Sequence, residues 1–126
     1  LFLKNKKNKF FLFSCEENDE LNLKKISKSF NLGNISFAKK DDLINLLGVE
    51  PGSVSPYALL NDFKNMVSFY LEIKLYDSEF INFHPLTNTS TITLKSDDFV
   101  KFMIENNKKI NIFSSRKEVI IKTYGQ

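Results

Sequence analysis

Apolar and polar positions at the start of the chain alternate in short runs. Two apolar runs, residues 1–4 and 9–15, flank the polar stretch Asn-Lys-Lys-Asn, a pattern that predicts a β-hairpin. Both faces of residues 10–15 are apolar, as in a strand that is covered on both sides. We therefore expect this segment to be a central strand, with Cys15 as a small core side chain rather than a reactive thiol.

Helical spacing follows. An apolar helical face is formed by Leu23, Ile26 and Phe30. Asn22 suits the N-cap of this helix, and Gly33 suits the left-handed residue that closes a helix. The pattern therefore predicts a short amphipathic helix between these two residues.

A strand and a second helix come next. Residues 35–37 have the composition of a short strand. Leu43, Leu46 and Leu47 then form one helical face, and Gly48 is placed to end the helix. Two helices therefore alternate with strands in the first half of the chain.

The second half repeats both patterns. Strand-like runs are found at residues 67–71, 79–83, 91–94 and 110–113. Residues 72–77 predict a short helix or a turn, and a final helix begins at Ser96. The tail, residues 114–126, is ambiguous, although residues 118–122 could pair at a sheet edge. Together the elements predict a single α+β domain with a mixed sheet.

Composition and charge narrow the class only slightly. With 126 residues, 42% of them apolar, the chain suffices for one domain and one core. A net charge of +3 suits RNA or another anionic partner, but scattered lysines also keep an ordinary protein in solution. A lone cysteine excludes an internal disulfide and fits the cytoplasm, which is the expected location. No apolar run approaches the ~20 residues that span a bilayer, so we expect no membrane partner.

A loop between the second helix and the next strand is rich in turn residues. Pro51 and Gly52 form a turn signal, and Pro56 fixes a second backbone angle. A loop of this shape exposes backbone N–H groups that suit a carbonyl or phosphate oxygen. The alternative interpretation is a plain connecting turn.

The one histidine of the chain, His84, lies directly before Pro85 and a run of hydroxyl and amide side chains. Proline biases His84 toward extended geometry, so the imidazole is expected at the end of a strand. From the residues alone, a structural side chain and a catalytic one both remain open. No nucleophile elbow, Gly-rich phosphate loop or multi-histidine set is present in the sequence, and we expect neither a metal nor a cofactor.

Three separated segments carry a family resemblance: LFLKNKKNKFFLF, SFAKKDDLINLLGVEPGSVSPYALLND and INFHPLTNTSTITL. In this order they resemble the prolyl-tRNA-synthetase-associated editing domains. These are YbaK-like aminoacyl-tRNA deacylases, and the most similar branch is the free-standing one that hydrolyses alanyl-tRNA(Pro). The resemblance implies a mixed, strongly curved sheet packed by helices. It also implies tRNA as the partner, with prolyl-tRNA synthetase as a second candidate and no role for DNA.

The resemblance also assigns roles to residues. It places catalytic functions on Gly52 and His84, where the histidine orients the aminoacyl group and the substrate's own ribose hydroxyl activates water. Phe83 falls where the family sets pocket size, so alanine is favoured by exclusion of larger groups. The backbone that holds the aminoacyl end is expected at Ser53, Val54, Ser55 and Pro56.

Five further polar residues are weaker substrate-binding candidates: Asn61, Asp62, Asn82, Asn88 and Thr89. For each of them a structural role, such as capping a turn or a strand end, is an equal alternative.

One departure from the family pattern concerns the start of the chain. The family's key lysine falls two residues before the position of Leu1, and Lys4 matches only the second lysine of that motif. We therefore expect residues 1–126 to be an editing domain that lacks its N-terminal segment. Two alternatives to an active deacylase stay open: a non-catalytic module that binds tRNA or the synthetase, and an editing insertion cut from a synthetase.

Overall fold

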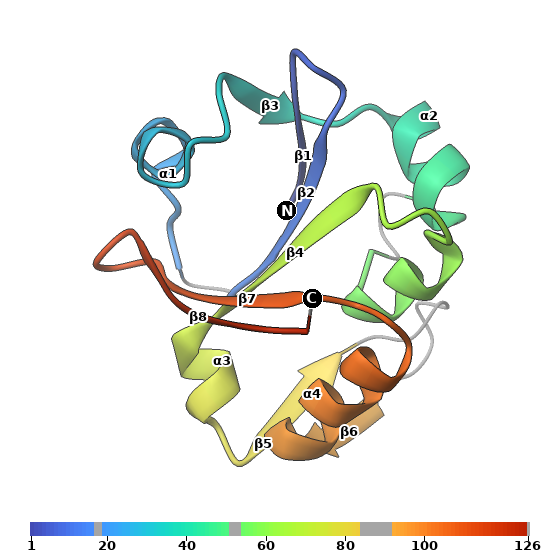
Figure 1. The fold of residues 1–126 in the computed structure, drawn as a ribbon, viewed down its shortest axis with the longest axis vertical. Helices are drawn as coiled ribbons and strands as arrows, with labels where there is room; N and C mark the ends of the chain where they lie inside the picture. The colour runs from blue at the N-terminus through green and yellow to red at the C-terminus, as the bar shows by residue number, and fades with distance from the viewer. Residues whose placement is uncertain (17–18, 51–53, 84–91, 126) are drawn as a thin grey trace.

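A computed structural model describes residues 1–16, 19–50, 54–83 and 92–125 (Figure 1). Its centre is a six-stranded sheet with the strand order β3-β1-β2-β4-β7-β8. The strands are β1 (Phe2–Asn5), β2 (Phe10–Ser14), β3 (Ile35–Phe37), β4 (Val67–Glu72), β7 (Ile110–Ser114) and β8 (Val119–Tyr124). The predicted hairpin is confirmed, since β1 pairs antiparallel with β2.

The sheet is mixed, as expected. The inner strands β2, β4 and β7 run parallel to one another. The outer strands pair antiparallel, with β3 beside β1 and β8 beside β7. Because parallel strands are normally buried on both faces, the apolar run of β2 is explained by its position between β1 and β4.

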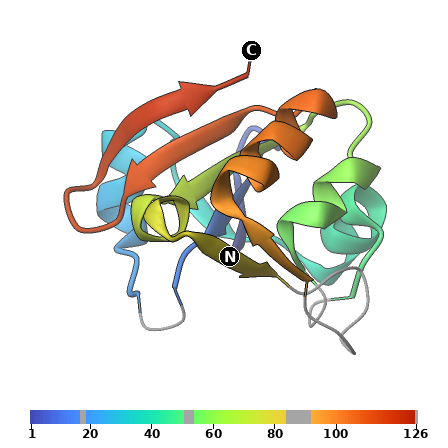
Figure 2. The ribbon, with the colours of Figure 1, turned by 90° about the horizontal axis from the view of Figure 1, so that it is seen from below.

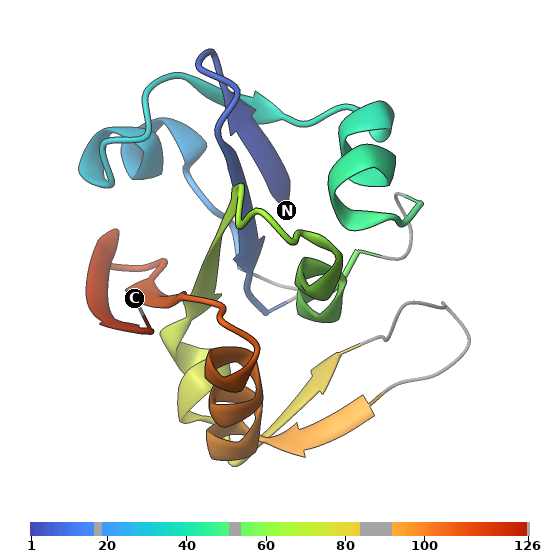
Figure 3. The same cartoon turned by 45° about the vertical axis from the view of Figure 1, so that its right-hand side comes forward.

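One face of the sheet is covered by α1 (Leu23–Ser29). Alternate residues of the strands point to this side, among them Phe11, Phe13 and Tyr70, which pack with Ile26 of the helix. The rings of Phe13 and Tyr70 are stacked, with centroids 4.5 Å apart. Figure 3 shows α1 and α2 on opposite sides of the strands.

The opposite face carries the larger core. It is covered by α2 (Lys40–Asp42), the π-helical turn η1 (Leu43–Leu47), the 3₁₀ helix η3 (Pro56–Asn61) and α4 (Ser96–Glu105) (Figure 2). Leu12, Phe69 and Ile112 of the sheet pack in one cluster with Leu47 and Phe99 of these helices. Successive side chains of β2 and β4 point to opposite faces of the sheet and therefore pack into two separate cores.

The architecture differs from the predicted single mixed sheet in one respect, the presence of a small second sheet. β5 (Phe80–Phe83) and β6 (Ile92–Lys95) form a two-stranded antiparallel sheet of their own instead of joining the main one. The ambiguous segments are now assigned: residues 73–77 form α3 (Ile73–Asp77), and the tail forms β8. The α+β class with a mixed sheet is confirmed.

Helix ends follow the predicted chemistry with one change. Asn22 caps α1 through a bond from the Lys25 backbone N–H to its Oδ1, 3.1 Å long, and Gly48 ends η1 at a φ of 67°. The left-handed residue that follows α1 is Asn31 (φ 57°), and Gly33 (φ 78°) shapes the next turn. Across the described ranges, no helix has the length and apolar character needed to cross a membrane.

Candidate functional site

An open cleft of about 770 Å³ lies where two parallel strands end. The carboxyl end of β2 contributes Ser14 and Cys15, and α3, which follows the carboxyl end of β4, contributes Leu75. Other walls come from residues 54–56 and from Phe80, Ile81 and Asn82 of β5. The carboxyl ends of parallel strands are the usual place for ligands in open sheets with helices on both faces.

Ser55 is the most informative polar residue of this cleft. Its backbone is extended (φ −147°, ψ 165°) because it precedes Pro56, the first residue of η3. The side chain is only 4% exposed, and its hydroxyl has no hydrogen-bond partner in the described part of the chain. An unsatisfied buried hydroxyl costs roughly 1–3 kcal/mol. An incoming carbonyl oxygen or amine would remove that cost.

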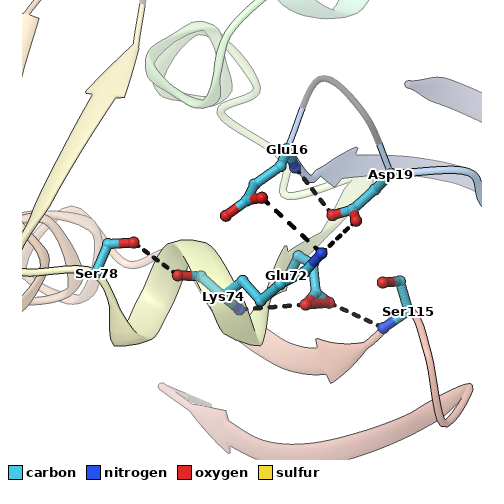
Figure 4. A network of polar contacts seen from close by, with 6 residues as sticks. All are labelled: Glu16, Asp19, Glu72, Lys74, Ser78 and Ser115. Carbon is cyan, nitrogen blue, oxygen red and sulfur yellow. Dashed lines mark hydrogen bonds and ion pairs between the residues drawn. The ribbon is translucent and has the colours of Figure 1, made fainter.

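Carboxylates form another wall. Glu16 and Asp19 both line the cleft, and both contact the ammonium of Lys74, as Figure 4 shows. Asp19 also accepts the Glu16 backbone N–H at 3.2 Å. The hydrogen bond to Asp19 raises the pKa of Lys74, so this lysine stays charged at neutral pH. Two carboxylates for one lysine leave this wall suited to a positively charged group of a ligand.

Behind this wall a buried carboxylate ties three elements together. Glu72, the last residue of β4, is 1% exposed. It accepts the backbone N–H of Lys74 at 3.2 Å, which caps α3, and the backbone N–H of Ser115 at 2.9 Å, which follows β7 (Figure 4). The cleft wall is therefore fixed to the main sheet.

Cys15 is half-buried and lines the cleft, so the prediction of a core side chain is wrong, but its thiol is a poor nucleophile. Burial is the largest cause and raises the pKa of its thiol, although the N-terminal ammonium acts in the opposite direction. Since the thiolate is the reactive form, this thiol is less reactive at neutral pH than a free cysteine. Within the described ranges, no three His, Cys, Asp or Glu side chains gather in a way that could hold a metal ion.

Four of the expected site residues meet in this cleft: Val54, Ser55, Pro56 and Asn82. Asn82 accepts a hydrogen bond of 2.5 Å from the Thr93 hydroxyl on the partner strand β6. Phe83 ends β5, paired with Ile92. The remaining expected residues lie outside the described ranges, and their roles stay predictions: Gly52, Ser53, His84, Asn88 and Thr89.

The other two candidates are not among the residues that line the cleft. The Asn61 side chain donates to the Leu47 carbonyl at 2.8 Å and so caps the end of η1. The Asp62 carboxylate accepts the backbone N–H groups of Met66 and Val67 at 3.0 and 2.8 Å. These contacts are the structural alternative that the sequence left open, and the cleft gives no support to a substrate contact by either residue.

The sequence interpretation missed the acidic wall. Its signal was present, because an acidic stretch that contains Glu16 and Asp19 directly follows the buried strand β2. Polar residues just beyond the carboxyl end of a buried parallel strand are well placed for a ligand. The contact of both carboxylates with Lys74 was not visible from spacing, since Lys74 lies far along the chain.

Comparison with known proteins shows that the chain matches the model of one protein family. The family model described as "Aminoacyl-tRNA editing domain" matches residues 1–102. This match covers β1 to most of α4, and therefore every segment that lines the cleft.

Individual relatives agree with that match. The chain is 35% identical over 108 residues to the prolyl-tRNA synthetase associated domain-containing protein 1 of Xenopus laevis, covering 82% of the chain and 64% of the relative. It is 28% identical over 107 residues to the prolyl-tRNA editing protein ProX of Acetoanaerobium sticklandii, covering 84% and 65%. The chain thus spans less than two thirds of the length of these relatives.

A solved structure shares the fold. The crystal structure of the hypothetical protein APE2540 superposes with a TM-score of 0.65 at 13% sequence identity, covering 80% of this chain and 64% of that one. At that identity the likeness concerns the fold alone.

Proposed function

Because the chain belongs to the aminoacyl-tRNA editing domain family, we propose that it hydrolyses the ester bond of mischarged aminoacyl-tRNA, with alanyl-tRNA(Pro) as the substrate. The names of its relatives, which refer to prolyl-tRNA editing and to prolyl-tRNA synthetase, support this choice. The need for such an enzyme is physical. A synthetase pocket built for proline rejects a smaller apolar residue by only a few kcal/mol, so a second hydrolytic step restores fidelity.

The observation that carries the proposal is the cleft lined by Ser55, whose buried hydroxyl has no hydrogen-bond partner among the described residues. An aminoacyl ester offers a carbonyl oxygen as an acceptor and an α-ammonium as a donor. The hydroxyl of Ser55 can donate to the first, and the acidic wall of Glu16 and Asp19 attracts the second. The Ser55 hydroxyl and the acidic wall thus match the two polar groups next to the ester.

Hydrolysis proceeds in this proposal without a protein base. The ribose hydroxyl next to the ester accepts a proton from water and passes its own proton to the ester-bearing ribose oxygen, while the water oxygen attacks the carbonyl carbon. The bond from that carbon to the ribose oxygen breaks, and the ribose oxygen leaves with a proton. The products are free alanine and tRNA with a free terminal ribose. The raised pKa of the Cys15 thiol fits this scheme, because no covalent step on the protein is needed.

The discrimination between amino acids rests on size. Phe83 and His84 follow Asn82, which lines the cleft, and we propose that they limit the space beside the aminoacyl group. Alanine then enters and larger side chains are excluded, as a steric clash discriminates more strongly than a missing contact. Prolyl-tRNA(Pro), the correctly charged product, is spared for the same reason.

The direct test follows alanine released from purified alanyl-tRNA(Pro). The wild-type chain should release alanine faster than buffer alone, and His84→Ala should lose at least about tenfold in kcat/KM, the equivalent of ~1.4 kcal/mol. Prolyl-tRNA(Pro) is the control substrate and should stay intact. A chain that binds tRNA but leaves the alanyl ester intact would instead be a non-catalytic binding module. Hydrolysis that is unchanged in His84→Ala would contradict the role of the histidine.

Partners and location follow from the same proposal. The substrate is tRNA, and prolyl-tRNA synthetase is the source of the mischarged form. We propose the cytoplasm as the site of action, since charged tRNA is consumed there.

A further inference from the structure

A second hollow, of about 550 Å³, lies at the other end of the β1–β2 hairpin. Three lysines of the hairpin turn line it, Lys6, Lys7 and Lys9. Its opposite wall is the loop after α1, with Asn31 and Asn34. The hairpin turn stands at the top of Figure 1, away from the small sheet β5–β6 that borders the cleft.

The charge of this hollow is uncompensated. All three lysines are exposed, and no Asp or Glu is among the described residues that line the hollow. The neighbouring Lys4 differs, because its ammonium pairs with Asp42 at 3.4 Å. No ion pair involves Lys6, Lys7 or Lys9 in the described part of the chain. Three positive charges therefore lie close together with no ion-pair partner among the described residues.

The turn that carries these lysines is held in one shape. The side-chain oxygen of Asn5 accepts the backbone N–H groups of Lys7 and Lys9, both at 3.0 Å. The Asn5 amide group donates to the Leu32 carbonyl at 2.9 Å, which ties the turn to the loop after α1. Asn8 supplies the left-handed residue of the turn, with a φ of 59°. A ligand therefore meets a backbone that needs little ordering on binding.

We propose that this hollow, here called the lysine hollow, binds backbone phosphates of the tRNA whose aminoacyl end enters the cleft. The inference rests on the proposed function and adds to it the surface that holds the body of the substrate. Lysine ammonium groups neutralise phosphates, and this contact supplies most of the affinity of proteins for nucleic acid regardless of sequence.

Geometry and charge favour RNA as the occupant. Strand β2 links the two sites, since Lys9 precedes it and Ser14 of the cleft ends it. The five residue steps from Lys9 to Ser14 span ~17 Å at ~3.3 Å each, a distance that a few nucleotides cover. The charged side chains of the cleft are acidic, whereas those of the lysine hollow are basic. An aminoacyl-tRNA end has the matching order, an ammonium at its tip and phosphates behind it.

The test compares two triple variants with the same change in charge. The first is Lys6→Gln with Lys7→Gln and Lys9→Gln. The control is Lys64→Gln with Lys101→Gln and Lys117→Gln, three exposed lysines that line neither site. The dissociation constant for tRNA(Pro) is measured over a range of salt, together with hydrolysis of alanyl-tRNA(Pro) and of 3′-alanyl-adenosine, which has no phosphate. Thermal unfolding of both variants shows that each one is folded.

We expect the hairpin variant to bind tRNA at least about tenfold more weakly than the control. Its salt slope should fall by about 2, since each phosphate contact contributes ~0.7 to the slope. Hydrolysis of 3′-alanyl-adenosine should stay unchanged. Equal affinity and equal slope in the two variants would overturn the inference, and so would an equal loss on both ester substrates. A wild-type chain that binds tRNA through these lysines but cleaves no ester would contradict the proposed function alone, whereas a chain that binds no tRNA would contradict both.

Discussion

At the scale of single residues, Ser55 combines burial with an unused hydrogen-bonding group. Its hydroxyl lies in the wall of the cleft and has no partner among the described residues. The unsatisfied hydroxyl therefore lowers the free energy of unfolding, a cost that a hydrophobic or smaller residue at this position would avoid. Such costs are typical of binding sites, where the missing partner arrives with the ligand.

Replacing Ser55 by alanine separates stability from function. We expect the free energy of unfolding to rise by roughly 1 kcal/mol, because an unsatisfied hydroxyl is removed. Alanine release should slow about tenfold in kcat/KM, because the hydrogen bond to the ester is lost. Urea denaturation and the deacylation assay measure the two effects. Ser29→Ala, at the exposed end of α1, is the control and should change neither. If Ser55→Ala were less stable than wild type and fully active, Ser55 would not be the residue that binds the ester.

Cys15 allows a prediction with pH. Because burial raises the pKa of its thiol, the folded chain holds less thiolate at neutral pH than the unfolded chain does. Alkylation by iodoacetamide should therefore be slower in the folded protein, and its rise with pH should be shifted to higher pH. The same chain in urea is the control. If the pH midpoint of alkylation in the folded protein lay at or below that of the unfolded chain, the thiol pKa would not be raised by burial. Loss of ester hydrolysis in Cys15→Ser would contradict a mechanism without a covalent step on the protein.

Whether the role of a residue could be predicted from the sequence depended on how far along the chain its interaction partner lies. The N-cap Asn22 and the left-handed Gly48 follow from local rules, and both are confirmed. Asn61 and Glu72 act through partners that lie 14 and 43 residues away, which no local pattern encodes. Val54 and Ser55 of the loop before Pro56 line the cleft, and their substrate-binding role stays a prediction, which only the family resemblance favoured over a plain turn.

At the scale of elements, the cleft exists because three segments converge at one edge of the parallel strands. β2 and β4 run in the same direction, so α3 and the acidic wall lie at the same end as residues 54–56. Glu72 keeps α3 in place through backbone N–H groups on two sides. The position of the cleft thus depends on a carboxylate that does not line it.

Truncating that carboxylate should loosen the cleft. We expect Glu72→Ala to lower the free energy of unfolding by about 2 kcal/mol, since a helix cap and a buried N–H partner are lost together. The melting temperature and urea midpoint report this change. Glu105→Ala, at the exposed end of α4, should stay within about 0.5 kcal/mol of wild type. Equal stability of the two variants would show that Glu72 does not fix α3.

The sequence pattern predicted where the strands lie but not which strands pair with each other. The period-two pattern of residues 79–83 and 91–94 identified two strands correctly, with ends within one residue of β5 and β6. Pattern alone did not show that they pair in a separate sheet. The tail stayed ambiguous because the residues of β8 are largely exposed, so burial gives its pattern no contrast.

At the scale of the whole molecule, the charged surfaces are arranged in an order that suits a charged, elongated substrate. The acidic cleft and the lysine hollow lie at opposite ends of β2. Net charge alone, +3, did not reveal this order, since it averages over both regions. Under the proposed function, phosphates approach the basic end and the ammonium of the amino acid approaches the acidic end, so we expect the field of the protein to orient the substrate before contact.

The central claim is that the cleft at the carboxyl end of β2 receives the aminoacyl end. The most direct measurement is a titration of the isotope-labelled chain with 3′-alanylamido-3′-deoxyadenosine, a non-hydrolysable analogue of that end, followed by amide chemical shifts. We predict the largest shifts at Cys15, Glu16, Ser55 and Asn82, with Ser55→Ala weakening the binding. Shifts centred instead on the small hollow beside Lys109 and Asn111, with the cleft unchanged, would contradict the account.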